Sequence, residues 1–269
     1  MRYTQKRSPM TQIPYIDEHW GVVTGCSGQG CKCRDNCWAR DMVRRFPAIH
    51  AGSNLLFDPH NPNRPVNFDV VQFHPDRLNK PLYWRKPRRI GVCFTGDWMD
   101  DQVKCEWIDD IMAIMFQADW HTYFTLTKQV KNLRERLTEY YPHPHIYHGV
   151  SICDQEDADT KIPDLLRIPG KHWISIEPML SPVNLRDYLP IETIGGVEME
   201  SWPSWIVIGA ESGPKRRPCP HEWMIAPVEQ CQAAQVPVWV KAVSIDGKVV
   251  HDINLFPEAL KVRQMPCAT

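Results

Sequence analysis

The chain has 269 residues, of which 43% are hydrophobic, and 31 Lys and Arg residues balance 32 Asp and Glu residues to give a formal net charge of −1. The length suits one large domain or two small ones, and the balanced charge gives no overall field that would favour nucleic acid or an anionic membrane. No stretch approaches the roughly 20 apolar residues of a membrane-spanning helix, and no apolar run follows the first residues as in a signal peptide. We therefore expect a cytoplasmic protein with no membrane partner.

The first predicted strand covers residues 19–24 and ends at a cysteine-rich loop. Four of the ten cysteines, Cys26, Cys31, Cys33 and Cys37, lie in this loop together with glycines that let the backbone turn tightly. Thiolates this close repel one another unless a cation or cluster neutralises them, and soft sulfur ligands select zinc, Cu(I) or iron–sulfur clusters. Because no signal peptide accompanies these cysteines, a disulfide pair is the less favoured alternative.

A helix is predicted over residues 38–46, where apolar side chains recur on one side, and Pro47 ends it. The following stretch, 47–89, is rich in Pro, Asn, Asp and His and is predicted to be an irregular insertion. It closes on the basic run WRKPRR at residues 84–89. A solvated face is the favoured interpretation of this run, and a phosphate or nucleic-acid contact is the alternative.

From residue 89 onward, apolar runs alternate with helical patterns. The predicted strands cover residues 89–95, 122–126, 146–152, 172–176, 205–208 and 236–240. The predicted helices cover residues 106–118, 130–140, 158–166 and 221–234. Strands and helices that alternate at this spacing imply βα units and a parallel sheet, and about seven strands come near the eight of a closed barrel.

We therefore predict one α/β barrel domain over residues 1–245, partial or complete and TIM-like, with parallel strands. It carries irregular insertions near 47–89 and 183–203, and residues 246–269 form a C-terminal tail. A doubly wound open sheet is the alternative fold, although no GxGxxG follows a strand, which weakens its dinucleotide-binding version.

Nearly every predicted strand ends in a polar or charged residue, and in a parallel barrel these ends face one cavity. The residues are Cys26, Asp97, Lys128, Asp154 with Gln155, Glu177, Glu211 with Ser212, and Lys241. A buried charge is costly unless it is paired or used. Glu177 and Lys241 follow strongly apolar runs, which favours a function, although an ion pair between the two is the structural alternative. For Asp97 or Asp154 alone, a helix cap or a structural ion pair explains the residue equally well.

Several motifs together resemble the phage Gp37/Gp68 family, a domain of unknown function (DUF5131) found in phages and bacteria. The matching motifs are TGC (24–26), NCWAR (36–40), LYWRKPRRI (82–90), LTK (126–128), GVS (149–151), EPMLSP (177–182), IGAESGP (208–214) and VPVWVK (236–241). The resemblance spans about residues 19–243. Family members are similar to radical S-adenosylmethionine (SAM) enzymes in a three-cysteine motif and a barrel-type fold, so the resemblance implies a radical SAM-type fold here.

The resemblance also implies a [4Fe–4S] cluster with SAM as a second cofactor. The family pattern selects Cys26, Cys31 and Cys37 as the ligands. Cys33 is then a bystander, a substitute for Cys31, or the fourth thiolate of a zinc site. The spacing C-x4-C-x-C-x3-C departs from the common CxxxCxxC, and the chain after Lys241 lacks the family's Lys-Gln-Trp-Gly ending.

Roles for other residues follow from the same resemblance. The residues implied to bind the cofactors are Trp38, Asp97, Lys128, Ser151, Asp154, Gln155 and Ser212. Asp97 stands where radical SAM enzymes hold the methionine amino group, and Trp38 would cover the cluster or pack against adenine. The residues implied to face the substrate as catalytic groups are Glu177, Glu211 and Lys241.

The implied activity is that of an enzyme that generates a 5′-deoxyadenosyl radical and receives electrons from a reductase. A nucleotide or nucleic acid substrate is compatible with it, with the basic residues 85–89 and 215–217 as phosphate contacts. The alternative from another class is a zinc-binding, nucleic-acid-associated accessory protein without redox chemistry. A hydrolase with Glu177 and Glu211 as acid and base is a third interpretation, although neither Gly-x-Ser-x-Gly nor HExxH supports it.

Overall fold

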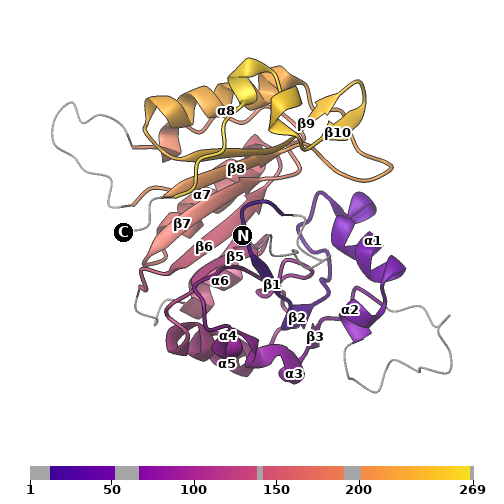
Figure 1. The fold of residues 1–269 in the computed structure, drawn as a ribbon, viewed down its shortest axis with the longest axis vertical. Helices are drawn as coiled ribbons and strands as arrows, with labels where there is room; N and C mark the ends of the chain where they lie inside the picture. Colours follow the sequence, from indigo (N-terminus) through magenta and orange to yellow (C-terminus); the bar gives the residue numbers. More distant parts are fainter. Residues whose placement is uncertain (1–12, 52–66, 138–141, 191–200, 267–269) are drawn as a thin grey trace, which may run out of the picture. The chain divides into compact units, whose positions relative to one another are not determined.

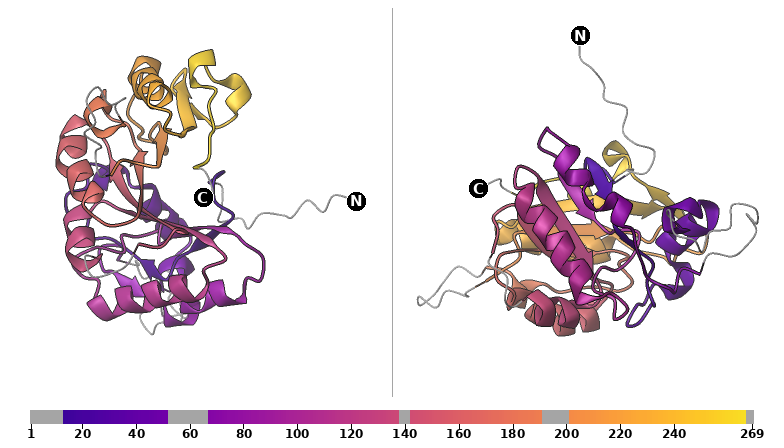
Figure 2. Two further views of the ribbon diagram at one scale, coloured as in Figure 1. Left: turned by 90° about the vertical axis from the view of Figure 1, so that its left-hand side faces the viewer. Right: turned by 90° about the horizontal axis from the view of Figure 1, so that it is seen from below.

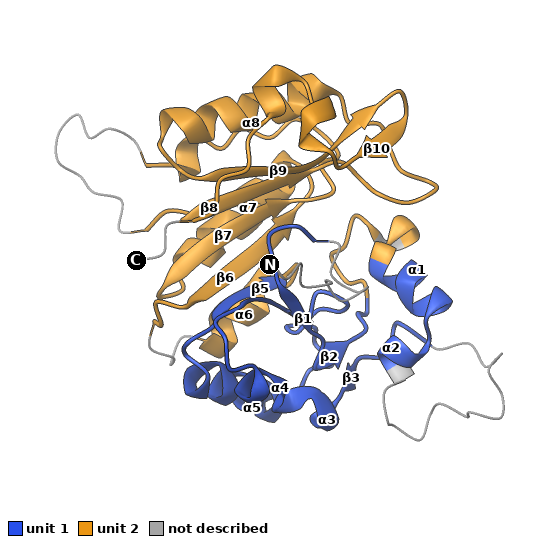
Figure 3. Ribbon diagram, viewed as in Figure 1, with its two compact units in different colours: residues 1–27, 39–126 blue, residues 28–38, 127–269 orange. Residues whose placement is uncertain are grey.

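The structure is a computed structural model of the whole chain and describes residues 13–51, 67–137, 142–190 and 201–266. The chain clusters into two compact units (Figure 3). Unit 1 comprises residues 1–27 and 39–126, and unit 2 comprises residues 28–38 and 127–269. The boundary divides the cysteine-rich loop, because Cys26 belongs to unit 1 whereas the other three loop cysteines belong to unit 2.

Unit 1 is built on three parallel strands in the order β1-β4-β5. The strands are β1 (Glu18–Trp20), β4 (Arg89–Val92) and β5 (Thr122–Thr127). The connection from β4 to β5 contains α5 (Cys105–Gln117), which buries Ile108, Ile111, Met112 and Met115 on one stripe. This i, i+3, i+4, i+7 spacing is what makes the segment an amphipathic helix.

The predicted strand 19–24 is two strands, since Gly21 and Val22 separate β1 from β2 (Val23–Thr24). β2 pairs antiparallel with β3 (Gln72–Phe73), outside the parallel sheet. The break is held by Arg77, whose Nη1 donates to the carbonyl of Gly21 at 3.1 Å.

The described parts of the stretch 47–89 are more regular than predicted. The predicted helix at 38–46 is α1 (Trp38–Arg45), and after Pro47 come α2 (Ala48–Ala51), β3, α3 (Pro75–Leu78) and α4 (Lys80–Tyr83). Proline stands at the start of α3 and within the first turn of α4, where its missing N–H costs no helical hydrogen bond. Residues 52–66 of this predicted insertion lie outside the described residues.

Unit 2 contains four parallel strands and one antiparallel strand in the order β6-β7-β8-β9-β10 (Figure 1). They are β6 (Ile146–Ile152), β7 (Lys171–Ile176), β8 (Trp205–Gly209), β9 (Val238–Ile245) and β10 (Lys248–Val250). Every residue of β6 and β8 is buried, as expected of parallel strands covered on both faces.

The helices of unit 2 are α6 (Val130–Leu137), α7 (Gln155–Leu166) and α8 (His221–Ala233). Short 3-10 turns are η1 (Arg34–Asn36), η2 (Arg186–Tyr188), η3 (Ile253–Leu255) and η4 (Glu258–Leu260). α7 packs on β6 and β7, and α8 packs on β8 and β9 (Figure 2). No helix among the described residues combines the length and the apolar character that a membrane crossing requires.

These observations confirm the α/β class and the mostly parallel strands, and β6 has the predicted bounds 146–152. The organisation as one domain over residues 1–245 stays a prediction. The last predicted strand was too short, because the apolar alternation continues beyond Val240 and β9 extends to Ile245. Lys241 therefore lies within a strand and not at its end. The segment after β9 forms β10, η3 and η4, and the Gln264 carbonyl accepts the indole N–H of Trp205 at 2.8 Å.

Candidate functional site

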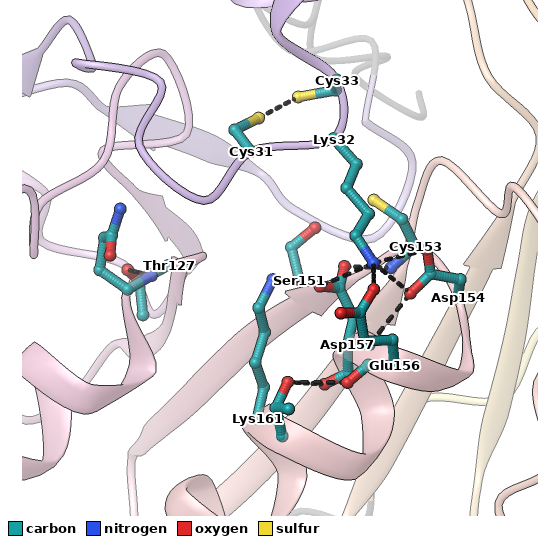
Figure 4. Close-up of polar contacts among 12 residues, drawn as sticks. Cys31, Lys32, Cys33, Thr127, Ser151, Cys153, Asp154, Glu156, Asp157 and Lys161 are labelled. Carbon is teal, nitrogen blue, oxygen red and sulfur yellow. Dashed lines mark hydrogen bonds and ion pairs between the residues drawn. The ribbon is translucent and has the colours of Figure 1, made fainter.

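The loop 28–38 of unit 2 brings three thiols together. Sγ of Cys31 lies 2.7 Å from Sγ of Cys33 (Figure 4), and Cys33 has a second side-chain hydrogen bond with Cys37. Cys33 is buried, whereas Cys31 and Cys37 are partly exposed, and all three are free thiols. Cys33, which the family pattern left without a certain role, is thus the central member of this cluster, which we call the thiol cluster.

The protonation of the thiol cluster follows from these contacts. The hydrogen bond with Cys33 and then burial raise the pKa of the Cys31 thiol, while the positive charge of Lys128 opposes the rise. For Cys33 the bond with Cys31 lowers the pKa, but the bond with Cys37 and burial outweigh it and raise the pKa overall. The thiols of Cys31 and Cys33 therefore keep their protons at neutral pH in the absence of a cation, and a bound metal would displace these protons.

Lys32, which stands between two of these cysteines, anchors the loop to the start of α7 (Figure 4). Its Nζ lies 2.7 Å from both carboxylate oxygens of Asp154 and 2.8 Å from Oε2 of Glu156. Asp154 is also the N-cap of α7 and accepts the N–H of Asp157 at 3.0 Å. The carboxylate of Asp154 is therefore fully occupied by the loop and its own helix.

The charges of this anchor support one another. Burial alone would lower the pKa of Lys32, but its bonds to Asp154 and Glu156 outweigh burial and raise it. Burial alone would raise the pKa of Asp154, but the bond from Lys32 outweighs burial and lowers it. Both groups stay ionised near neutral pH, so the anchor is a charge-assisted contact.

Two further side chains hold the loop by donating to its backbone carbonyls. Nη1 of Arg217 donates to the carbonyl of Lys32 at 3.2 Å, and Nε2 of Gln129 donates to the carbonyl of Gln29 at 2.6 Å. Arg217 is itself held by Glu211, whose Oε2 accepts the backbone N–H at 2.7 Å and the guanidinium Nε at 2.9 Å. Burial raises the pKa of Glu211, but the bonds from Arg217 outweigh it and lower the pKa. Glu211 is 4% exposed, and by holding the Arg217 side chain that donates to the Lys32 carbonyl it stabilises the loop.

Glu177 and Lys241, predicted to face a substrate, pair with each other. Oε1 of Glu177 lies 2.5 Å from Nζ of Lys241, and the two side chains are 21% and 16% exposed. A Cβ atom at Gly209 would lie 3.3 Å from Cδ of Glu177, so the glycine makes room for the carboxylate. The hydroxyl of Ser151 donates to the carbonyl of Glu177 at 3.1 Å. The arrangement is the structural alternative that the sequence left open.

In unit 1, Cys26 sits on a loop fixed by backbone contacts. Its N–H donates to the carbonyl of Phe68 at 3.0 Å. The next residue, Ser27, donates from both its N–H and its hydroxyl to Oδ2 of Asp100, at 2.8 and 2.7 Å. Asp100 is fully buried, and the sequence reasoning missed it. The only available signal was the acidic run DWMDD at residues 97–101.

Glycines allow this loop to pack backbone against backbone. Gly25 has φ +90°, and a Cβ atom there would lie 2.7 Å from the carbonyl oxygen of Val70. A Cβ atom at Gly96 would lie 2.7 Å from the carbonyl oxygen of Gly25. The carbonyl of Gly25 also accepts the N–H of Asp97 at 3.0 Å. The Asp97 carboxylate, 4% exposed, accepts the N–H of Met99 at 3.0 Å and so caps its own turn.

A buried hydroxyl network that the sequence did not reveal supports Gly25 and Cys26. Oγ1 of Thr24 lies 2.8 Å from Nδ1 of His50 and 2.7 Å from Nε2 of His74. Nε2 of His50 lies 3.1 Å from the carbonyl of Asn67, which only an N–H can satisfy, so Thr24 donates to His50 and accepts from His74. Burial lowers the pKa of both histidines, to about 4 for His74, so each is neutral at pH 7.

The other residues predicted to bind a cofactor are spread over unit 2. Trp38, 41% exposed, begins α1, and Ser212 is partly exposed after β8. Gln155 donates to Asp159 at 2.7 Å and accepts the N–H of Asn184 at 2.7 Å. Lys128, directly after β5, acts electrostatically on Cys31 and Cys33. Across the described part of the chain, no three His, Cys, Asp or Glu side chains are arranged as ligands of a metal ion.

Much of the positive charge in the two basic runs is used inside the fold. Arg88 pairs with Glu18, and Arg89 pairs with Asp17 at 2.8 Å. Arg216 donates to the carbonyl of Gly247 at 2.8 Å. These contacts favour the structural interpretation of the runs over a phosphate-binding one.

Comparison with known proteins gives one match. No curated protein and no solved structure matches the chain. One family model, described as a protein of unknown function (DUF5131), matches residues 10–249. The match covers nearly the whole chain and includes every motif from 24–26 to 236–241 that carried the resemblance. The chain therefore belongs to the DUF5131 family.

Proposed function

We propose that this protein is a radical SAM-type iron–sulfur enzyme, and that its parallel strands belong to the partial or complete TIM-like barrel of that class. The observation that carries the proposal is the thiol cluster, in which Cys33 is hydrogen-bonded to Cys31 and Cys37. Gathered thiols are the donor set that iron–sulfur clusters use. They lie on a loop anchored through Lys32 next to the carboxyl end of β6, the end of the strands where α/β enzymes place their chemistry.

The donor chemistry fits a [4Fe–4S] cluster. The nearby charge of Lys128 favours the thiolate forms of Cys31 and Cys33, and the anchored backbone leaves mainly the cysteine side chains to adjust on binding. Cys31, Cys33 and Cys37 of unit 2 are candidate ligands, and the predicted ligand role of Cys26 rests on the family pattern alone. Held by these cysteines, such a cluster would supply the one-electron reduction that SAM cleavage needs, and a reductase would be the electron donor.

The chain's own residues divide into those that hold the loop and those that remain for cofactor or substrate. Asp154 and Glu211 hold the loop, through Lys32 and Arg217. Trp38, Asp97, Lys128, Ser151, Gln155 and Ser212 keep their predicted role toward SAM, and Asp97, Ser151 and Gln155 also make contacts inside the fold. The Glu177–Lys241 pair is partly exposed. It would offer a polar substrate the Glu177 carboxylate as a hydrogen-bond acceptor and the Lys241 ammonium as a donor.

For a nucleotide or nucleic acid substrate, the described basic side chains that remain exposed in the two runs include Arg85, Lys86 and Lys215. Their charge would contact phosphates with little sequence preference.

The position of Cys33 favours one second candidate, a structural zinc site. Four thiolates close a tetrahedral site and leave no open position for a substrate or SAM. With Cys33 among the ligands instead of apart from them, the loop offers four cysteines for such a site. The protein would then be a nucleic-acid-associated accessory protein without redox chemistry.

The proposal is tested by the product that radical SAM cleavage releases. Anaerobic protein given SAM and a strong reductant is expected to release 5′-deoxyadenosine, and Cys37→Ala is expected to abolish the release. The matched control is Cys105→Ala, since Cys105 is an exposed thiol at the start of α5 and outside the loop. Loss of 5′-deoxyadenosine in both variants, or none in the parent protein, would count against the proposal.

A further inference from the structure

We propose that Cys31 and Cys33 form a reversible disulfide, and that its formation withdraws the loop from metal binding. The second half rests on the proposed function, whereas the disulfide itself does not. Cys33 is hydrogen-bonded to both Cys31 and Cys37. We therefore expect any disulfide within the thiol cluster to include Cys33.

The geometry prepares this bond. The two sulfur atoms are 2.7 Å apart, and a disulfide bond is about 2.05 Å long, so closure needs only a small movement of the side chains. One residue separates the two cysteines, and that residue, Lys32, is fixed by Asp154 and Glu156. Figure 4 shows the Lys32 anchor beside the Cys31–Cys33 pair, so with Lys32 held there only the two cysteine side chains have to move.

The described cysteines outside the cysteine-rich loop are placed differently. Cys93, Cys153, Cys219 and Cys231 are each buried, and Cys105 is exposed at the start of α5. A small oxidant can reach the partly exposed Cys26, Cys31 and Cys37 as well as the exposed Cys105, and Cys31 has the Cys33 thiol 2.7 Å away.

A small-molecule disulfide such as oxidised glutathione supplies the oxidising equivalents. The Cys31 thiol first loses its proton to solvent; the thiolate attacks one glutathione sulfur, the glutathione S–S bond breaks, and one glutathione leaves as a thiolate that takes up a proton. The Cys33 thiolate then attacks the Cys31 sulfur of the mixed disulfide, which forms the Cys31–Cys33 bond and releases the second glutathione. Two protein thiols are oxidised and one glutathione disulfide is reduced to two thiols.

The sequence provides a direct readout. Trypsin cuts after Lys32 and Arg34, so Cys33 falls on a different peptide from Cys31 when reduced and on one linked product when the two are joined. The peptide with Cys31 also carries Cys26, so fragmentation of the linked product distinguishes a 31–33 bond from a 26–33 bond. The full chain, freed of metal with a chelator and a reductant, is incubated with oxidised glutathione, blocked with an alkylating agent, digested and analysed by mass spectrometry. The expected result is a linked 31–33 product that dithiothreitol removes.

Variants sharpen the test. Cys33→Ser is expected to abolish every linked loop product, whereas Cys37→Ser retains the 31–33 product and Cys105→Ser changes nothing in the loop. If Cys105 is glutathionylated while the loop stays unlinked, or if a Cys31–Cys37 product dominates, the proposed disulfide is overturned.

Iron uptake tests the second half separately. The oxidised chain is expected to take up no iron and sulfide until dithiothreitol is added. Equal uptake by the linked and reduced chains would overturn the withdrawal of the loop while the disulfide stands. Failure of both chains to take up iron would overturn the withdrawal together with the proposed function, and the linked peptide would still report on the disulfide.

Discussion

The ammonium group of Lys32 lies 2.7 Å from both carboxylate oxygens of Asp154, a residue 122 positions later in the chain. This contact joins the peptide between two loop thiols to the cap of α7. The contact places the thiol cluster at the carboxyl end of β6. It also gives Asp154 a structural role, which the sequence alone could not distinguish from ligand binding.

Removing the anchor is expected to loosen the loop. Lys32→Met should lower the free energy of unfolding by about 1–2 kcal/mol, because a partly buried charge-assisted contact is lost. It should also raise the alkylation rate of Cys31 and Cys33 several-fold. Lys131→Met is the matched control, since the Lys131 side chain is 74% exposed and makes only a long contact of 4.0 Å with Glu135. Urea unfolding and timed alkylation measure the two effects, Lys32→Arg should restore both, and equal behaviour of the two methionine variants would contradict the anchor.

Glu211 makes the stability of unit 2 dependent on pH. Its pKa is lower in the folded chain than the ordinary 4.5, so its contribution is present above about 4.5 and is lost as pH falls through the folded pKa. Glu211→Gln should cost about 1–3 kcal/mol at pH 7, since Arg217 loses its buried carboxylate partner. The cost should shrink when urea unfolding is repeated in strong acid. Glu222 is exposed on α8, so Glu222→Gln is the control. If the stability cost of Glu211→Gln were the same at pH 7 and in strong acid, this prediction would be contradicted.

Two buried histidines that face each other across β6 and β7 should set the acid sensitivity of unit 2. Burial, helped by His172, lowers the pKa of His148 to about 3, and burial lowers the pKa of His172 to about 4. The unfolded chain binds protons from about pH 6.5 downward, so stability should fall as pH drops from there towards 4, by up to about 1.4 kcal/mol per pH unit for each group. His148→Gln should flatten this slope in urea unfolding measured between pH 7 and 4.5. The partly exposed His143 offers the control His143→Gln, which should keep the slope of the parent chain.

The close approach at Gly25 predicts a difference between two glycines of the same loop. Both have positive φ, but a Cβ atom at Gly25 meets the Val70 carbonyl at 2.7 Å, whereas a Cβ atom at Gly30 meets nothing within 4 Å. Gly30→Ala should therefore cost about 1 kcal/mol from backbone strain alone, and Gly25→Ala at least about 2 kcal/mol more, from the clash. Thermal or urea unfolding measures both, and equal costs would show that the backbone at Gly25 yields easily.

The sequence predicted those elements that an apolar run or an amphipathic stripe determines by itself. β6 has the predicted bounds, α5 begins and ends one residue earlier than predicted, and α8 ends one residue earlier. The end of β9 was missed because Lys241 looked like a strand terminus, although Ala242 and Val243 continue the buried run.

Partners of charged residues could not be predicted, because an acid after a strand has the same local pattern whether it meets a ligand or a distant side chain. Asp154 was predicted to bind a cofactor and Glu211 to face a substrate, and each also holds the cysteine loop, through Lys32 and Arg217. The Thr24 network was missed because His50 and His74 lie in a stretch without periodicity. The role of Cys33 was left open between a bystander, a substitute for Cys31 and a fourth thiolate, because the family pattern carries no information about how the loop turns.

The central claim is that the cysteine loop holds an iron–sulfur cluster, and metal analysis of the protein purified without oxygen tests it most directly. The proposal predicts about four irons and matching sulfide per chain, with broad absorption near roughly 400 nm, strongly reduced in Cys37→Ala and unchanged in Cys105→Ala. One zinc per chain without iron, or iron that Cys37→Ala leaves in place, would contradict it.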